Sequence, residues 1–460
     1  MLENVLALMA QWKPVFAQER TAHRAMRQAL SSACAIGRRT IARSIAVREP
    51  VEGEGEDWSA EYRLHARSAW AEQDLFTPAL RAVVALCPGP LLPLATDDTR
   101  LPKSGKTIPT AYRGRDPMSP PFHVNLTWGV RFLHTSVLVP LHTTDAVAAR
   151  AVPVWFENTP PVKKPGRRAT ELERAAYREA IKTKNLSVEA VEMFGELRRR
   201  VDEVGGQAKR LVFALDASFT NRTTFRAPLE RTVLIGRTRK DAKLCWPAPE
   251  GSRRVYQAET FTPESVMSDA GVAWKTAEIF HGGQSRPIQY KELVGVLWRR
   301  GAATRPLRLV VVKPVPYRVM KAGRVMFRDP AFLLCTEVEG DVEPYLQIYF
   351  DRLHIEVAHR EVKDTFGVGQ AQVRSPTSVS RQPVLSMATY SLLHVAALQA
   401  YGARRAACFG PLPKWQREKT RASCQDLIRH LRNEVVDKPH LVAFLGLKLS
   451  PQSLLAAAAA

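Results

Sequence analysis

The run YFDRLHIEVAHREVK, residues 349–363, constrains this chain more than any other segment. Its residues Tyr349, Arg352, Glu356 and Lys363 are separated by steps of three, four and seven positions. On a helix of about 100° per residue these steps return to one side. We therefore predict a helix that presents a carboxylate flanked by two cations and a phenol. A second, buried side is predicted for Leu346, Phe350, Leu353 and Val357.

This combination of side chains suits an acid that holds a metal ion beside a phosphate. Arg352 and Lys363 would bind the phosphodiester, and Glu356 would donate oxygen ligands. The alternative interpretation is a solvated amphipathic helix in which Arg352 and Glu356 form an ordinary i,i+4 pair. If the metal interpretation holds, further acids must come from other elements.

A first pair of acids follows a short apolar run near residue 90. Leu91 to Ala95 reads as a buried strand, and it leads directly into Asp97, Asp98 and Thr99. Acids at such a strand end can be exposed at the edge of a core. The alternative is a strand-terminating turn with solvated aspartates.

A second acid, Asp216, follows the continuous apolar run from Leu211 to Leu215. A polar turn from Ser218 to Asn221 comes next, and then the stretch TVLIGRTRKDAKL. Asp241 lies in that stretch within a basic polar segment, so we interpret it as a solvated loop residue. The sequence thus provides two strand-end acids and one helical acid in order along the chain.

These three motifs together resemble the bacterial insertion-sequence transposases of the DDE superfamily that carry a YREK signature. The helix matches the Tyr-x2-Arg-x3-Glu-x6-Lys spacing, and the DDT triplet is followed by Pro-Lys-x-Gly-Lys. The resemblance implies that the catalytic, metal-binding acids are Asp98, Asp216 and Glu356, with Asp97 as the close alternative to Asp98. The DNA contacts that it implies are Tyr349, Arg352, Lys363, Arg237 and Arg239.

Three clustered carboxylates are what two-metal phosphoryl transfer requires, because two divalent ions about 4 Å apart need that much negative charge. Hard oxygen ligands select Mg²⁺, so we expect two Mg²⁺ ions, for which Mn²⁺ can substitute.

Composition agrees with a nucleic-acid partner. The 460 residues carry a formal net charge of +22, and 45% of them are hydrophobic, which suffices for folded cores. No run of 18 apolar residues is present, and Glu3 stands where a signal peptide needs basic residues. The six cysteines show no zinc spacing. We therefore expect a cytoplasmic, nucleoid-associated bacterial protein with no membrane contact.

The sequence divides into five predicted regions. Residues 1–88 are a helical DNA-end-binding region, in which Gly37 precedes Arg38, Arg39 and Arg43 as in a helix-turn-helix; a plain helical hairpin is the alternative. Residues 89–235 and 305–380 are the two parts of an RNase H-like core, residues 236–304 are a β-rich insertion, and residues 381–460 are a C-terminal helical region.

The predicted fold class is therefore α/β: an RNase H-like mixed-sheet catalytic core with a β-rich insertion and flanking helical regions. We expect strands at 91–98, 209–216, 307–313 and 331–337, and two strands within about 126–141. A long polar helix is predicted for about 168–204, after an exposed connection from Pro153 to Arg168.

The insertion between Asp216 and Glu356 is a further point of resemblance. In those transposases it helps to form a hairpin on the cleaved DNA end and supplies an aromatic side chain that stacks a flipped base. Trp298 and Trp274 are the residues that this implies here. Alternation in VGVLWRR equally places Trp298 in the insertion's own core.

The sequence thus predicts a cut-and-paste DNA transposase that cleaves and joins strands at the terminal repeats of double-stranded DNA. The resemblance also implies a homodimer in the DNA complex. The alternatives are a domesticated DNA-binding protein without transposition activity and an RNase H-like nuclease or resolvase. The insertion distinguishes the transposase from simple nucleases of that fold.

Overall fold

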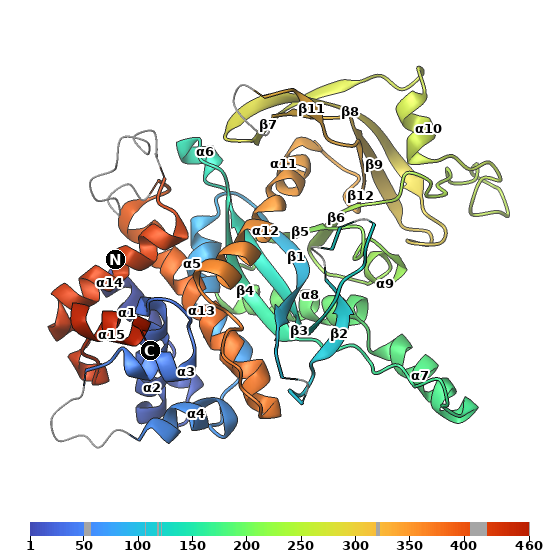
Figure 1. Cartoon of the computed structure of the whole chain (residues 1–460). Coiled ribbons are helices and arrows are strands. Elements are labelled where there is room, and N and C mark those ends of the chain that lie inside the picture. Colours follow the sequence, from blue (N-terminus) through green and yellow to red (C-terminus); the bar gives the residue numbers. More distant parts are fainter. Residues whose placement is uncertain are drawn as a thin grey trace.

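A computed structural model describes residues 1–49, 57–105, 107–116, 119–120, 122–318, 323–404 and 421–459 (Figure 1). The chain is a mixed α/β protein built around one large sheet. Helices from both ends of the chain gather beside one edge of this sheet, and a long β-hairpin extends the other edge.

Ten strands form the large sheet, in the order β2-β3-β1-β5-β6-β12-β9-β8-β7, with β4 paired to β3. The strands are β1 (Leu91–Pro102), β2 (Tyr112–Arg115), β3 (Leu126–Val139), β4 (Arg150–Asn158), β5 (Arg210–Leu215), β6 (Thr232–Arg237), β7 (Lys275–His281), β8 (Gln284–Leu297), β9 (Pro306–Val312) and β12 (Ala331–Cys335). Strands β10 (Pro316–Tyr317) and β11 (Met326–Phe327) form a separate small hairpin.

The centre of the sheet has a specific pairing pattern. Strands β1, β3 and β4 pair antiparallel as a meander, whereas β5 lies parallel to β1 and β6 lies parallel to β5. The remaining strands, β12, β9, β8 and β7, all pair antiparallel with their neighbours. The β1–β5 contact therefore brings the ends of two parallel strands to the same edge of the sheet.

The strand predictions at 91–98, 209–216, 307–313 and 331–337 are confirmed by β1, β5, β9 and β12. The prediction of two strands within 126–141 is wrong, because this segment is the single strand β3. The exposed connection predicted from Pro153 is also wrong up to Asn158, because β4 covers it and is largely buried. Pro153 lies in a strand that pairs only with β3, beside a register shift, where a missing N–H is tolerated.

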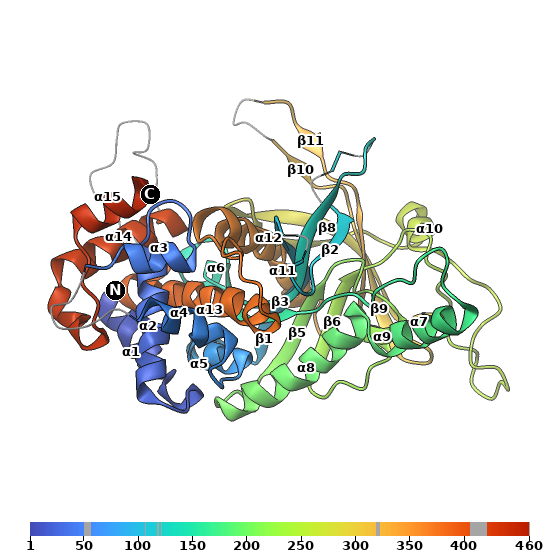
Figure 2. The same cartoon turned by 60° about the horizontal axis from the view of Figure 1, so that its bottom comes forward.

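Helices cover both faces of the sheet (Figure 2). Helix α8 (Leu186–Glu203) packs on one face with Met193, Phe194 and Leu197, in the same cluster as Leu94 of β1. Helices α11 (Glu343–Asp351) and α12 (Leu353–Arg360) pack on the other face, in the same cluster as Ala95. Alternate residues of β1 thus face different helices.

The single long helix predicted for 168–204 is wrong. The structure has two helices, α7 (Glu171–Thr183) and α8, separated at Lys184. Asn185 starts the second helix, since its side chain accepts hydrogen bonds from the amides of Ser187 and Val188 at 3.0 and 3.2 Å. The N-cap residue Asn185 therefore marks the boundary between two helices that the polar pattern had suggested to be one.

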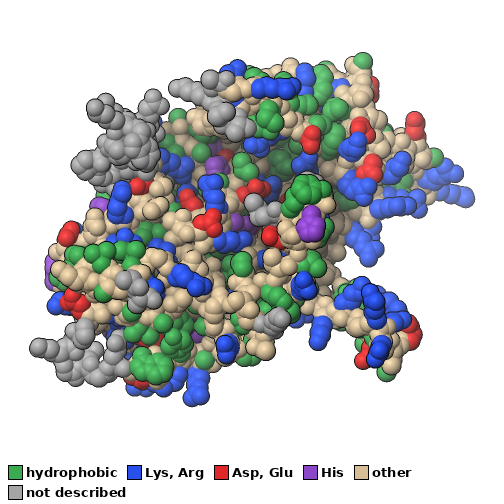
Figure 3. Space-filling model, in the orientation of Figure 1, with side chains coloured by type: hydrophobic (Ala, Val, Ile, Leu, Met, Phe, Trp, Pro, Cys, Tyr) green, Lys and Arg blue, Asp and Glu red, His purple; other side chains and the backbone are tan. Residues whose placement is uncertain are grey.

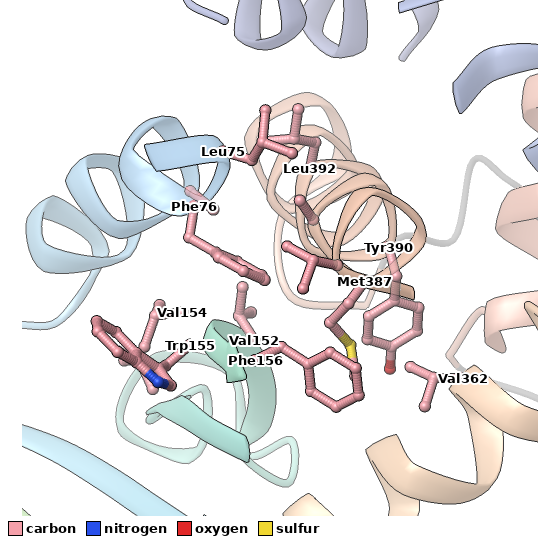
Figure 4. Close-up of a cluster of buried hydrophobic side chains, with 14 of the residues drawn as sticks. Leu75, Phe76, Val152, Val154, Trp155, Phe156, Val362, Met387, Tyr390 and Leu392 are labelled. Atoms are coloured by element: carbon pink, nitrogen blue, oxygen red, sulfur yellow. The ribbon is translucent and has the colours of Figure 1, made fainter. Parts of the chain in front are cut away.

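The terminal regions of the chain pack together as one helical body. It contains α1 (Leu2–Ala10), α2 (Glu19–Cys34), α3 (Ile41–Ala46), α4 (Trp58–Ala66), α5 (Thr77–Leu86), α13 (Pro376–Tyr401), α14 (Cys424–Asp437) and α15 (Pro451–Ala459). Helix α13 contacts α1, α2, α4 and α5, and its residues Met387 and Leu392 lie with Phe76 and β4 in one buried cluster (Figure 4). Residues 1–88 therefore share their core with the C-terminal helices. Among the described residues, no helix is long and apolar enough to span a bilayer.

The region 236–304 begins with irregular backbone and the short helix α10 (Pro263–Ser268), and continues into the β7–β8 hairpin. Strand β8 pairs with β9, so the hairpin continues the large sheet rather than forming a sheet of its own. A register shift between Val294 and Val296 occurs at Gly295, whose φ of 84° favours glycine.

Candidate active site

Two aspartates meet where the parallel strands β1 and β5 stop pairing. The last paired couple is Thr96 and Leu215, and the next residues along the two strands are Asp97 and Asp216. Strand β1 itself continues to Pro102, paired only with β3. Neighbouring strands lie about 4.8 Å apart, so the two acids are close neighbours.

The strand register distinguishes Asp97 from Asp98. Asp97 follows Ala95, and Asp216 follows Ala214, by two residues; both alanines lie in the cluster covered by α11 and α12. Asp98 instead follows Thr96, whose hydroxyl bonds that of Thr135 on the α8 face at 2.8 Å. Because side chains alternate along a strand, Asp97 and Asp216 share the face that carries Glu356, and Asp98 lies on the opposite face.

The helix of the YREK motif is not one regular helix. It is interrupted at Arg352, between α11 and α12, and continues after Arg360 as a π-helical turn, Glu361–Thr365. From Ile348 onward the buried residues of this segment recur at three- and four-residue steps: Ile348, Asp351, Ile355, Ala358 and Val362.

The predicted buried side of this helix is therefore wrong in part. Leu346 is buried, but Leu353 is 40% exposed and Phe350 and Val357 are half-buried. The stripe that packs on the sheet lies one residue before each residue of the motif. The four motif residues therefore lie along the margin of the buried stripe. This position lets their polar ends reach the edge of the core, where a site can be open to a ligand.

The structure brings the four motif residues beside the aspartates. Arg352 donates to Glu356 at 3.3 Å. Burial raises the pKa of the Tyr349 phenol, whose charge environment includes Arg352, Arg237 and Asp216. Burial also lowers the pKa of the Lys363 ammonium, which the nearby Asp364, Asp97 and Asp98 oppose. The predicted phosphate-binding and acidic side chains thus interact electrostatically with one another.

The loop after β5 holds Asp216 in a defined orientation. Its Oδ1 accepts hydrogen bonds from the Ser218 amide and hydroxyl, at 2.9 and 2.7 Å, and from the Phe219 amide at 3.2 Å. Asn221 caps the short helix α9 (Arg222–Phe225) that follows. The polar turn predicted after Asp216 therefore serves to fix one carboxylate oxygen and leave the other available.

Negative charge at this site is not neutralised by the protein. Burial, followed by the charges of Asp216 and Asp98, raises the pKa of the Asp97 carboxyl to about 7, although Arg352 opposes the shift. Burial also raises the pKa of Asp98, against the influence of Arg131. Among the described residues, no cationic group lies within 4.0 Å of the carboxylate oxygens of Asp97, Asp98 or Asp216.

These carboxylates suit a hard divalent cation, because oxygen ligands and uncompensated charge both favour one. Their ligand atoms are not yet gathered: Glu356 is half exposed and turned toward Arg352. The described residues contain one group of three side chains whose possible metal-ligand atoms lie within 4.8 Å of one another: the carboxylate of Glu361, the imidazole of His394 and the thiol of Cys424. Arg150 already donates hydrogen bonds to Glu361 and His394, so a cation occupies that position.

A basic groove with a volume of about 540 Å³ adjoins the acids. Arg237 and Arg352 line it, together with Tyr349 and residues that the sequence analysis did not single out. These additional residues are Val312, Lys313, Val315, Tyr317, Phe327, Arg328, Asp329, Ala331, Phe350 and Leu353. Arg239 lies outside the groove lining, exposed and paired with Asp241 at 2.7 Å. The solvated position predicted for Asp241 is confirmed.

A histidine pair behind the acids was not predicted as part of the site. His134 is the β3 partner of Asp97, and its Nδ1 lies 2.8 Å from Nε2 of His359 on α12. The other nitrogen of His134 lies 2.8 Å from the Ser136 hydroxyl. This chain of hydrogen bonds joins the acid-bearing sheet to the Glu356 helix. Only the spacing of His359, three residues after Glu356, was visible in the sequence.

The three arginines predicted to read DNA belong to the helical body, in and just before helix α3. Helix α3 contains only Ile41–Ala46, and of the three arginines only Arg38 is exposed. Arg39 is 9% exposed, with its guanidinium over the Phe366 ring, and Arg43 donates to the Ala457 carbonyl. Arg38 lines a groove with residues 370–375.

The two tryptophans considered for base stacking are both in packing contacts. Trp298 is half-buried, with its ring 5.9 Å from that of Phe225. Trp274 lies under the ammonium groups of Lys291 and Lys313, at 4.9 and 5.4 Å from its centroid. The packing alternative for Trp298 thus agrees with its surroundings.

The burial of Asp97 beside two other acids gives a first prediction, which concerns stability in the absence of metal. A folded-state pKa of about 7, against a usual value of 3.8, means that ionisation destabilises the fold as pH rises through this interval. At pH 8 in chelator, Asp97→Asn should therefore increase the free energy of unfolding by roughly 2 to 4 kcal/mol and raise the melting temperature accordingly. At pH 4 it should have little effect.

Thermal unfolding followed by circular dichroism at both pH values checks this prediction. The matched control is Asp241→Asn, because Asp241 is exposed and already paired. Adding Mg²⁺ at pH 8 should stabilise the wild type more than Asp97→Asn. An Asp97→Asn protein that melts below the wild type at pH 8 would show that the ionised Asp97 carboxylate does not destabilise the fold.

Comparison of the chain with protein-family models gave no match. Comparison with curated proteins gave none either.

Proposed function

We propose that this protein is a DDE-type DNA transposase that cleaves and joins DNA strands at the ends of a mobile element. The observation that carries the proposal is the placement of Asp97 and Asp216 at neighbouring parallel strand ends, on the face covered by the Glu356 helix. The sheet order β4-β3-β1-β5-β6, with an antiparallel meander followed by parallel strands, resembles the order expected of an RNase H-like core and supports the same proposal.

The acids that would hold Mg²⁺ are Asp97, Asp216 and Glu356. This assignment replaces Asp98 by Asp97, the alternative that the sequence left open, because Asp98 lies on the other face of β1. When bound, the metal would polarise the scissile phosphate and lower the pKa of the attacking water. Asp98 would then interact with Arg131 next to the site and would not bind the metal.

The remaining groups would bind and orient DNA. Arg237, Arg352 and Lys363 offer cations to the phosphates on either side of the scissile bond. Water attacks that phosphorus as its P–O3′ bond breaks, which leaves a 5′-phosphate and a 3′-hydroxyl. The 3′-hydroxyl then attacks a phosphorus of the opposite strand or of the target; the P–O3′ bond there breaks, and the leaving 3′-oxygen takes up a proton in exchange for the one that the attacking hydroxyl loses. The basic groove beside Tyr349 gives the duplex a path away from the acids.

The test is cleavage of a labelled duplex that contains the DNA flanking this gene, because inverted repeats there would be the substrate. With Mg²⁺ we expect a nick at the element end and then a covalently closed hairpin, resolved by time on denaturing gels. Hairpin formation needs a base to leave the stack, at a cost of a few kcal/mol. Nicks and double-strand breaks without a hairpin or joined product would favour the nuclease, and binding without cleavage would favour the domesticated DNA-binding protein.

A further inference from the structure

The segment from residue 160 to residue 185 leaves the sheet at the catalytic edge and returns to the same edge. On the outgoing side, Arg131 donates to the Thr159 carbonyl at 2.8 Å, and Asn158 donates to the Arg131 carbonyl at 3.0 Å. Arg131 is also the main positive charge near Asp98. The root of the segment is therefore fixed beside the aspartate doublet.

The returning side is fixed to the second acid. Asn221 donates to the Ser187 hydroxyl at the start of α8 and to the Ser218 carbonyl, both at 2.8 Å. Ser218 is the residue whose hydroxyl and amide hold Asp216. Both ends of residues 160–185 are thus anchored to groups that touch or surround the acids, and the segment projects from the site itself.

The helix in this segment contributes nothing to the core. None of the 13 residues of α7 is buried, and Leu172 is 81% exposed. Local bonds maintain the helix instead, through a capping box between Thr170 and Glu173. Figures 1 and 3 show α7 standing clear of the body at the lower right.

The first part of the segment carries only positive charges. Between Thr159 and Thr170 there is no acid, and four cations are exposed there: Lys163, Lys164, Arg167 and Arg168. Among the described residues none of the four forms an ion pair. The acids of α7 are engaged nearby, since Glu171 pairs with Arg178, and Glu179 pairs with Lys182 at 2.8 Å. The unpaired charge therefore concentrates in the connection next to the catalytic edge.

We propose that residues 160–185 form an arm that binds the phosphate backbone of the duplex beside the strand ends that carry Asp97 and Asp216. The proposal rests on the function proposed above. A helix of 13 residues extends about 20 Å, enough to follow several base pairs. A second copy of the chain is a poorer partner for this surface, because the chain carries a net charge of +22 and would present like charge.

The test is the salt dependence of DNA binding by the full-length protein. The probe is a labelled 30-base-pair duplex of random sequence, followed by fluorescence anisotropy between about 50 and 200 mM salt. The variant replaces all four connection cations: Lys163→Gln, Lys164→Gln, Arg167→Gln and Arg168→Gln. In a plot of log affinity against log salt concentration, we expect the magnitude of the negative slope to decrease by roughly 3 to 4. We also expect the affinity to fall at least about tenfold.

A matched control removes the same charge from the helical body, at exposed sites that likewise form no ion pair among the described residues: Arg20→Gln, Arg67→Gln, Arg81→Gln and Arg404→Gln. Its slope should change much less. A second variant that exchanges lysine and arginine at the four arm positions should keep the wild-type slope. Equal losses in the arm and control variants would overturn the proposal, because only net charge would then matter.

Light scattering distinguishes a protein partner from DNA. An arm variant with a wild-type salt slope but a lower mass in solution would overturn the proposal in favour of a contact between two copies. The two proposals also fail separately. A wild-type protein that does not cleave, but whose arm variant loses affinity, refutes the transposase and retains the arm. A wild-type protein that cleaves, with equal slopes in the arm and control variants, refutes only the arm.

Discussion

Asp97→Ala should abolish Mg²⁺-dependent cleavage of the element end, lowering the rate by at least about a thousandfold. The magnitude follows from the loss of a group that stabilises transition-state charge. Asp216→Ala and Glu356→Ala should have equally large effects. DNA binding should persist in all three, because each substitution removes a carboxylate and no phosphate-binding cation. Single-turnover cleavage and anisotropy measure the two properties separately.

Asp98→Ala is the informative control for this series, since it changes the adjacent residue on the other face of β1. We expect it to reduce the rate far less than Asp97→Ala. A harmless Asp97→Ala together with an inactive Asp98→Ala would show that the metal ligand is Asp98 after all. A Glu356→Ala protein that cleaves at the wild-type rate would refute the role of the YREK helix.

Arg150→Ala should destabilise the fold by roughly 3 to 5 kcal/mol, as expected for removing one partner of a buried ion pair. Arg150 on β4 donates to Glu361 at 3.3 Å and to the Tyr390 hydroxyl at 2.9 Å. The Tyr390 hydroxyl in turn donates to Glu361 at 2.6 Å. Figure 4 shows Tyr390 on α13 facing Val362, within the cluster that joins α13 to the sheet.

The same substitution should lower cleavage activity, because Glu361 directly follows the helix that carries Glu356. Thermal and urea unfolding measure the stability. The double variant Arg150→Met, Glu361→Gln should cost less than Arg150→Ala, since it removes both charges from the buried site. If the double variant is destabilised by more than Arg150→Ala, the two residues do not act as a pair.

Much of the site could be predicted because its signals are local. An apolar run that ends at an acid marks a strand end, which is how Asp97, Asp98 and Asp216 were found. Tyr349, Arg352, Glu356 and Lys363 recur at steps of three, four and seven residues, and these steps place them on one side of a helix. These patterns depend on the chain within a few residues, so the positions of β1, β5 and the helix of the motif followed from them.

The tertiary structure decided what depends on neighbours distant in the sequence. Whether Asp97 or Asp98 faces Asp216 depends on the β1–β5 register and on which helix covers each face. Leu353 is exposed because packing on the sheet buries the stripe formed by Ile348, Asp351, Ile355, Ala358 and Val362, and Leu353 lies outside that stripe. Arg39 looked like a DNA contact but is buried, because residues 1–88 pack against helices from the other end of the chain.

By itself, then, the sequence determined the acids, the cations and the elements that carry them, because periodicity and strand ends are written in consecutive residues. Only the tertiary structure decided which face each acid occupies, that residues 160–185 stand free of the core, and that the two ends of the chain form one body. The presence or absence of such contacts depends on segments more than a hundred positions apart, where no local pattern specifies the partner.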